Sequence, residues 1–241
     1  SEWISDANFG AVADAASEQV DHEGFRVAAE EVIEQISRGV AAYVEKGGST
    51  DDLAILFCGH SRGGAAANIA AAYADEMASG PHALAPLSSI YCYAFAVPRT
   101  TTAPGAADAP YDNIFNVLNP SDLAPRLPLS TWGYARYGRD VRLPAYGSAA
   151  FEASYDEMRR RFLENVGVES PYDPTDVETV TDVENDLAEK VPTQEDFLSV
   201  GGVTALAEAL MQRMDVGRVL CGHYPNTYIA WMQSVSAADL S

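Results

Sequence analysis

The amino-acid sequence predicts an α/β fold in which a mostly parallel central sheet is flanked by helices. Two uninterrupted apolar runs, 53–58 and 89–96, are typical of strands buried on both faces, as parallel strands are. They alternate with segments of helical periodicity, which indicates a layered α/β domain. With 241 residues, of which 47% are apolar, the chain can bury a substantial core.

Each expected element has a local signature. Residues 23–44 place apolar side chains at three- and four-residue spacing, which predicts an amphipathic helix that Gly47 and Gly48 close. The strand at 53–58 follows, and an alanine-rich helix then runs from a glycine-rich turn to about Met77. The remaining expected elements are a strand at 89–96, a strand at 113–118 and a short edge strand at 137–143.

Charge and cysteine content exclude several classes of function. The chain has 35 Asp and Glu against 15 Lys and Arg, and its net charge of -20 is repelled by nucleic-acid phosphates and by anionic membrane surfaces. No apolar stretch approaches the ~20 residues that a membrane-spanning helix needs. The 3 cysteines are too few, and odd in number, for a disulfide framework. Neither a nucleic-acid partner nor a transmembrane segment is expected.

The stretch from 148 to 216 differs in composition from the rest of the chain. Between 151 and 200 it carries 14 acidic and four basic residues. Two helical pieces, 151–166 and 203–214, are expected to flank a loop rich in Pro, Asp and Thr. We interpret 148–216 as an acidic helical insertion in a single domain, 1–241. It is either a solvated acidic face or a cap over a site.

The segment Gly59-His60-Ser61-Arg62-Gly63 fits the pattern G-x-S-x-G, the nucleophile elbow of α/β-hydrolases. A buried strand leads into it and a helix leads out of it, which is the setting that the motif requires. The turn raises the Ser61 hydroxyl above the strand ends. It also points the Arg62 backbone N–H and the positive end of the helix at a developing oxyanion. Ser61 is therefore the candidate nucleophile, and the Arg62 N–H is a candidate oxyanion donor.

A serine nucleophile needs a histidine base, and the base needs a carboxylate to hold its tautomer. In α/β-hydrolases these residues follow in the order Ser, acid, His. Of the 4 histidines, His22 and His60 precede or adjoin the serine. His82 lies before any candidate acid. His223, ahead of a C-terminal amphipathic helix, is therefore the candidate base.

Asp122 is the candidate acid because it comes just after the expected strand at 113–118. The carboxyl ends of parallel strands are where sheets of this kind build their sites. Asp108, Asp112 and Asp140 compete on sequence position, but none of them follows directly on a clear strand.

Several motifs recur together across the chain outside the acidic insertion. They are HEGF at 22–25, GHSRGG at 59–64, AFAVPR at 94–99, NPSDLAPRLP at 119–128, and His223 with Tyr224. With these motifs the chain resembles the class 3 (fungal-type) lipases of the α/β-hydrolase fold, and the Asp before a Pro-Arg-Leu-Pro turn is the most family-specific feature. The resemblance implies that Ser61 is the nucleophile, Asp122 the acid and His223 the base.

The N-terminus departs from the family pattern. Class 3 lipases place an oxyanion-hole Ser or Thr in an Arg-Gly-Ser/Thr turn, followed by a lid helix with a Trp-Ile pair. Trp3 and Ile4 resemble the second half of that lid, so the turn with the second oxyanion donor would lie upstream of Ser1. We expect a C-terminal chain cut within its lid, with the N-terminal part of the same precursor bound as a partner chain. A boundary unrelated to natural cleavage is the alternative.

The resemblance implies a lipase or other carboxylic-ester hydrolase that cleaves acylglycerols or related lipid esters through an acyl-enzyme, in a family that is usually secreted. A non-catalytic binding module that keeps the fold is one alternative, and an esterase of small non-lipid esters is another. Retention of all three triad residue types favours catalysis. Triad chemistry needs no metal or organic cofactor, so none is expected. Calcium is not expected at the acidic run 182–186, because Leu187 follows it where a loop of the EF-hand type needs glycine.

Overall fold

A computed structural model describes residues 21–198 and 216–240 and divides the chain into two compact units. The first unit holds the described residues up to Asn116 together with Tyr134–Arg139. The second holds Val117–Gly133 and the described residues from Asp140 onward.

The four strands expected from the sequence are present. They are β1 (Ile55–His60), β2 (Ile90–Phe95), β3 (Ile114–Leu118) and β4 (Arg139–Arg142), and they lie in the order β1-β2-β3-β4. β1 and β2 are parallel, in a register that pairs Ile55 with Ile90 and His60 with Phe95. β4 is an edge strand, as the sequence predicts.

The helices confirm the predictions at 23–44, at 62–77 and at 151–166. Those described are α2 (Glu23–Glu45), α3 (Arg62–Met77), α4 (Ala149–Val166), α5 (Asp176–Lys190), α6 (Gln194–Leu198), α8 (Val216–His223) and α9 (Pro225–Met232). The helix expected at 203–214 lies outside the described residues.

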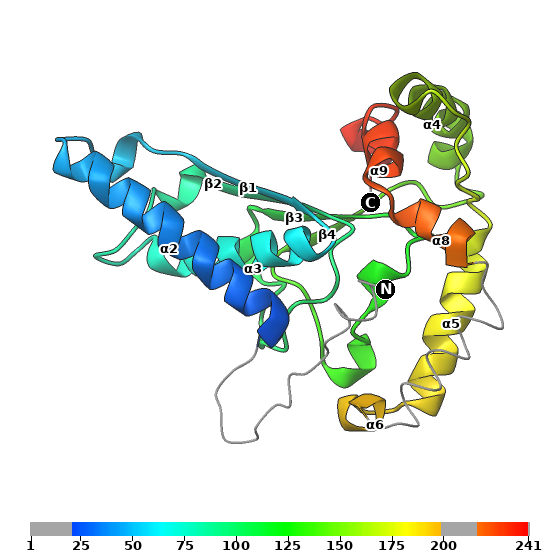
Figure 1. Cartoon of the computed structure of the whole chain (residues 1–241), viewed down its shortest axis with the longest axis horizontal. Coiled ribbons are helices and arrows are strands. Elements are labelled where there is room, and N and C mark those ends of the chain that lie inside the picture. Colours follow the sequence, from blue (N-terminus) through cyan, green and yellow to red (C-terminus); the bar gives the residue numbers. More distant parts are fainter. Residues whose placement is uncertain (1–20, 199–215, 241) are drawn as a thin grey trace. The chain divides into compact units, whose positions relative to one another are not determined.

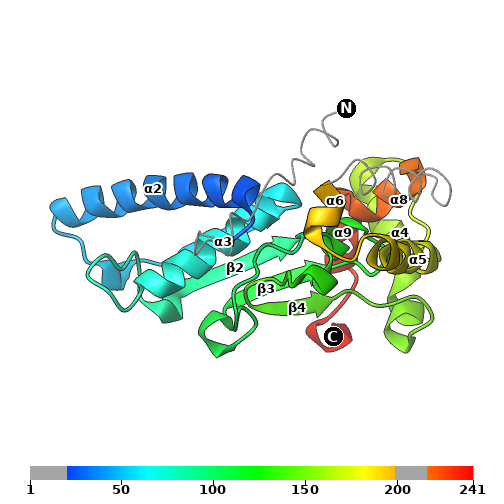
Figure 2. The ribbon, with the colours of Figure 1, turned by 90° about the horizontal axis from the view of Figure 1, so that it is seen from below.

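In the first unit the helices form layers on one face of the sheet, with α3 against the sheet and α2 against α3 (Figures 1 and 2). The alanines of α3 are buried, because small side chains let this helix approach β1 and β2 closely. α2 is amphipathic as expected, yet Ala29 is its only fully buried residue.

The opposite face of β1 and β2 carries exposed apolar side chains. Leu56 is 66% exposed, and Tyr91 and Tyr93 are also exposed. The register places Leu56 beside Tyr91 and Cys58 beside Tyr93, so these four side chains form one continuous patch, called here the open sheet face. Parallel sheets normally have both faces covered, so a face of this kind is a candidate binding surface.

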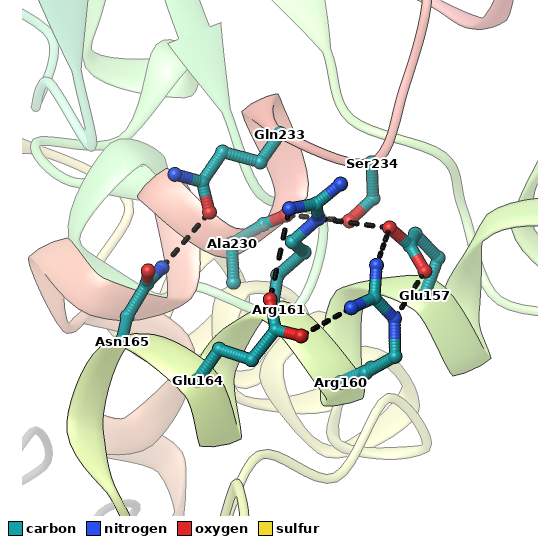
Figure 3. A network of polar contacts seen from close by, with 8 residues as sticks. All are labelled: Glu157, Arg160, Arg161, Glu164, Asn165, Ala230, Gln233 and Ser234. Carbon is teal, nitrogen blue, oxygen red and sulfur yellow. Dashed lines mark hydrogen bonds and ion pairs between the residues drawn. The ribbon is translucent and has the colours of Figure 1, made fainter.

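In the second unit, aromatic packing joins α4 to α9. The rings of Phe151, Tyr155 and Tyr172 surround the buried Trp231 at centroid distances of 5.7, 6.2 and 6.4 Å. Asn165 of α4 also donates a 2.9 Å hydrogen bond to Gln233 (Figure 3). The exposed ion pairs of α4 lie next to this bond and join Arg160 and Arg161 to Glu157 and Glu164. Such pairs contribute little to stability, so the aromatic packing carries most of the contact.

The prediction of a loop between the two helical pieces of the insertion is wrong, because α5 and α6 occupy much of that stretch. In α5, Val180, Val183 and Leu187 recur at helical spacing and are buried against Leu129. Acidic residues fill the first turn of α5 and Lys190 its last turn, which suits the helix dipole. The composition rich in Pro, Asp and Thr predicts a loop, because these residues are individually weak helix formers.

Neither a membrane-spanning helix nor a metal-binding cluster occurs in the described part of the chain. Among the described helices, none is both long enough and apolar enough to cross a membrane. Within residues 21–198 and 216–240, the His, Cys, Asp and Glu side chains form no group of three that could hold a metal ion.

Asp75 is a buried carboxylate in α3. Its Oδ1 accepts a 2.8 Å hydrogen bond from Asn113, while its Oδ2 has no hydrogen-bond partner among the described residues. Burial raises the pKa of Asp75 to about 6; the Asn113 hydrogen bond opposes this increase and the charge of Glu76 adds to it. The folded pKa lies above the unfolded value of about 3.9, so the folded state binds more protons between the two values. Stability therefore falls as the pH rises through this window.

Replacing Asp75 with asparagine is expected to raise the free energy of unfolding above pH 6 by about 1–3 kcal/mol, because the variant buries no charge. The variant should also lose the decline in stability between about pH 4 and pH 6. Urea unfolding at acidic and at neutral pH measures both effects, with the exposed Asp51→Asn as the control. The same pH dependence in Asp75→Asn and in the unmodified protein would contradict this assignment.

Candidate active site

Ser61 lies at a strained turn between β1 and α3. Its backbone has φ 57° and ψ -126°, in the left-handed half of the map that side chains other than glycine rarely adopt. Its N–H donates a 2.9 Å hydrogen bond to the carbonyl of Phe95, which fixes the turn to the end of β2. This strand–turn–helix geometry is that of a nucleophile elbow.

The glycines around Ser61 have different roles. A Cβ atom at Gly59 would lie 2.2 Å from the backbone oxygen of Gly63, and one at Gly64 would lie 3.0 Å from that of Phe95. Gly63 itself has open space where a Cβ would stand. The turn therefore requires glycine at 59 because the chain passes over itself there, whereas position 63 has no such requirement.

Gly59→Ala is expected to destabilise the protein by about 1–3 kcal/mol, because the atom that the new Cβ would meet belongs to the backbone and cannot rotate away. Gly63→Ala, the matched control within the same motif, should keep or slightly raise stability, since alanine favours a helix by about 1 kcal/mol over glycine. Urea unfolding followed by circular dichroism compares the two. Equal losses in both variants would show that the close approach at Gly59 does not govern the turn.

Arg62 is the first residue of α3, so its N–H lies at the positive end of the helix dipole. That is the position expected of an oxyanion donor. Trp3 and Ile4, interpreted as a lid remnant, lie outside the described residues. The second oxyanion donor was expected upstream of Ser1.

Asp122 and His223 meet in the second unit. The Nδ1 atom of His223 lies 3.0 and 2.9 Å from the two carboxylate oxygens of Asp122. Both side chains are buried, at 1% and 6% exposure. Asp122 follows β3 by four residues, and His223 is the last residue of α8. A carboxylate at Nδ1 holds the ring proton there, which leaves Nε2 as the basic nitrogen of this dyad.

Two further groups bind the Asp122 carboxylate. Its Oδ1 accepts a 2.9 Å hydrogen bond from the Ala124 N–H, and its Oδ2 accepts one of 2.8 Å from the Tyr228 hydroxyl. The Tyr228 oxygen in turn accepts the N–H of Asn119 at 3.0 Å. Tyr228 is not identified from the sequence as a partner of Asp122. The signal that could have identified it is a tyrosine one turn into the helix that follows the candidate base.

The competing carboxylates lie elsewhere. Asp108 and Asp112 flank a short helical turn of the first unit, where the carbonyl of Asp112 accepts hydrogen bonds from Arg139. Asp140 is the second residue of β4. Of the four aspartates considered from the sequence, Asp122 is the one that contacts Nδ1 of His223.

The remaining histidines are also placed. His22 is buried and stacks on Phe25 at 4.4 Å, and this burial lowers its pKa. His60 ends β1, and His82 lies exposed in the loop after α3.

Ser61 belongs to the first unit, whereas Asp122 and His223 belong to the second.

A sequence model of the family described as lipase (class 3) matches residues 1–132. Because the match covers more than half of the chain, the protein belongs to the lipase (class 3) family. The predicted resemblance and the α/β-hydrolase fold class are thereby confirmed, and the family is one of serine ester hydrolases, the enzyme class that the sequence indicated.

Solved structures of fungal lipases are similar to this chain. The triacylglyceride lipase of Rhizomucor miehei is 22% identical with a TM-score of 0.45, over 59% of this chain and 52% of that one. The mono- and diacylglycerol lipase of Aspergillus oryzae is 24% identical with a TM-score of 0.43, over 61% and 50%. The chain thus spans about half the length of the structures it matches. No curated protein matches the sequence.

Proposed function

We propose that the protein is a carboxylic-ester hydrolase acting on acylglycerols or related lipid esters, with Ser61, Asp122 and His223 as its catalytic triad. The observation that carries this proposal is the buried dyad, in which the carboxylate of Asp122 holds Nδ1 of His223 at 2.9 Å. A buried carboxylate is costly unless its hydrogen bonds are satisfied, and Asp122 is bound by His223, by the Ala124 N–H and by the Tyr228 hydroxyl. The strained Ser61 turn and the family membership support the same conclusion.

In the proposed reaction the Ser61 oxygen attacks the ester carbonyl carbon while Nε2 of His223 takes the serine proton. Asp122 stabilises the imidazolium that forms. The bond between the carbonyl carbon and the alkoxy oxygen then breaks, and His223 gives its proton to the departing alcohol. Water repeats the sequence on the acyl-enzyme, which releases the fatty acid and restores Ser61. The Arg62 N–H is the proposed donor to the tetrahedral oxyanion.

Labelling with a fluorophosphonate tests the activated serine directly. Intact mass spectrometry before and after the probe should show one adduct, and peptide mapping should place it on Ser61. A folded protein that takes no adduct although a second chain co-elutes with it would favour the non-catalytic binding module. Labelled protein that hydrolyses short soluble esters but not emulsified triacylglycerol would favour the small-ester esterase.

We also propose that the open sheet face binds a second polypeptide, the N-terminal part of the same precursor. The patch is apolar, its Tyr93 ring stacks on Phe115 at 5.2 Å, and the Arg139 guanidinium lies over the Phe115 ring at 5.1 Å. It is therefore a built surface of packed rings that a helix could cover, as helices cover the faces of parallel sheets.

Cys58 is a natural reporter for this surface because its side chain is exposed on the open sheet face, while Cys92 and Cys221 are buried. Alkylation followed by mass spectrometry should modify Cys58 in this chain purified alone and spare it in protein from the natural source. The buried cysteines provide an internal reference for unfolding. Equal modification in both samples would reject the proposal, and protection that rises with concentration of the pure chain would replace it with self-association.

A further inference from the structure

The acidic insertion touches the turn that carries Asp122. The hydroxyl of Tyr172, a buried residue of the insertion, lies 3.3 Å from Oδ1 of Asn119 and 3.3 Å from Oγ of Ser121. The Ser121 hydroxyl donates in turn to the carbonyl of Pro174 at 3.1 Å, also in the insertion. The residues immediately before the candidate acid are therefore fixed by contacts from a segment about fifty residues away.

Asn119 connects this turn to the chain around His223. Its Nδ2 donates a 2.9 Å hydrogen bond to the carbonyl of Gly222, the residue before His223. Its Oδ1 accepts the Ser121 N–H at 3.2 Å as well as the Tyr172 hydroxyl. Because a carbonyl can only accept and an N–H can only donate, these partners fix the orientation of the amide. Asn119 is 2% exposed, so every one of these bonds is shielded from water.

The two segments also touch through their backbones. A Cβ atom at Gly222 would lie 2.9 Å from the carbonyl oxygen of Ser121, so this approach depends on glycine. The hydroxyl of Thr227 caps the same region by donating to the carbonyl of Cys221 at 2.7 Å. The distance between the Asp122 turn and the chain around His223 is therefore fixed by direct backbone packing of Gly222 against Ser121.

The insertion holds the other side of the Asp122 turn through α5. Arg126 donates to Glu184 of α5 at 2.8 Å and to the carbonyl of Pro120 at 2.7 Å. The Trp132 indole donates to the carbonyl of Val191 just beyond α5 at 2.9 Å. An apolar cluster joins the same two segments and contains Leu123, Leu127, Leu129, Val180, Val183 and Leu187. The insertion thus contacts the segment around Asp122 both through residues before α5, Tyr172 and Pro174, and through Val191 just after it.

We propose that the acidic insertion sets the geometry of the Asp122–His223 dyad, and that Tyr172 is a positioning residue acting through Asn119 and Ser121. The inference rests on the proposed function, since it assigns a role toward the same dyad. Burial raises the pKa of Tyr172 to about 12, so its hydroxyl remains a hydrogen-bond donor at neutral pH.

Tyr172→Phe removes only the positioning hydroxyl and keeps the ring against Trp231. Tyr155→Phe is the matched control, because Tyr155 belongs to the same aromatic cluster and its ring contacts those of Tyr172 and Trp231. We expect Tyr172→Phe to lower kcat by about 3- to 10-fold, the effect of one net hydrogen bond, with KM unchanged. Tyr155→Phe should leave kcat within about 2-fold of the unmodified protein.

A second readout needs no substrate. The Nδ1–H proton of His223, bonded to Asp122, should give a downfield resonance in the ¹H NMR spectrum of ¹⁵N-labelled protein. In Tyr172→Phe this resonance should move upfield and broaden, because a looser dyad exchanges its proton faster with water. The control variant should leave it in place, while thermal unfolding checks that both variants remain folded.

The two readouts separate the two proposals. A resonance that responds to Tyr172→Phe in a protein without esterase activity would support the positioning role and reject the proposed function. Normal activity with an unchanged resonance and kcat in Tyr172→Phe would overturn the positioning role and leave the proposed function standing.

Discussion

Replacing Ser61 with alanine is expected to lower kcat for ester hydrolysis by about 10⁶-fold and to abolish the fluorophosphonate adduct. A loss this large is expected because the hydroxyl is the proposed nucleophile, and without it only binding and the oxyanion donors would contribute to the rate. Alanine and serine have similar steric cost at the observed φ of 57°, so the variant removes the nucleophile without changing the strain of the turn. Thermal unfolding should be close to that of the unmodified protein.

Ser88→Ala is the control for this variant. Ser88 lies in the same unit, in the short turn before β2, and its loss should leave both labelling and kcat unchanged. Hydrolysis by Ser61→Ala above about 1% of the normal rate would mean that another side chain supplies the nucleophile. An adduct that persists in Ser61→Ala would identify that side chain by peptide mapping.

Ser61 is predictable from the sequence because all its determinants are local. The apolar run before it, the flanking glycines and the alanine-rich helix after it lie within about 25 residues, and each has a direct structural reason. The observed turn agrees down to the need for glycine at position 59.

The dyad is predictable for a different reason. Asp122 and His223 are 101 positions apart, and the sequence pairs them only through the required chain order and the resemblance to a family. What surrounds them was not predictable. Tyr172 and Asn119 meet through long-range packing, and a buried tyrosine in an acidic segment has no sequence signature that separates it from an ordinary core residue.

The missed helix α5 shows a related limit. Its buried residues have helical spacing, yet three-residue and four-residue periodicity is hard to recognise among Thr, Asp and Val, which favour other structures when taken singly. The helix is stabilised by its contact with Leu129 and Trp132, which lie in the Asp122 loop. Tertiary packing therefore decides the structure of this stretch, and the same packing joins the insertion to the candidate site.

Asp122→Asn is the second change with a large expected effect, a loss of about 10⁴-fold in kcat with little change in KM. The reason is the tautomer of His223. The Ala124 N–H can only donate, so the amide oxygen of the introduced side chain should take the place of Oδ1. The amide nitrogen then takes the place of Oδ2, 2.9 Å from Nδ1 of His223. An N–H donor at that position favours the tautomer with the ring proton on Nε2, where the base must accept one, over a bond from Nδ1–H to the amide oxygen 3.0 Å away.

This prediction distinguishes a catalytic dyad from a structural pair. The Tyr228 oxygen can accept from the new amide nitrogen, so this contact is kept with its direction reversed while the Tyr228 proton loses Oδ2 as its acceptor. The cost of one such hydrogen bond is small enough that the variant should still fold. The exposed Asp108→Asn is the matched control and should retain full activity. A loss of less than about 10-fold in Asp122→Asn would mean that His223 does not serve as the base, because a base with the wrong tautomer has no lone pair at Nε2 to take the proton of Ser61.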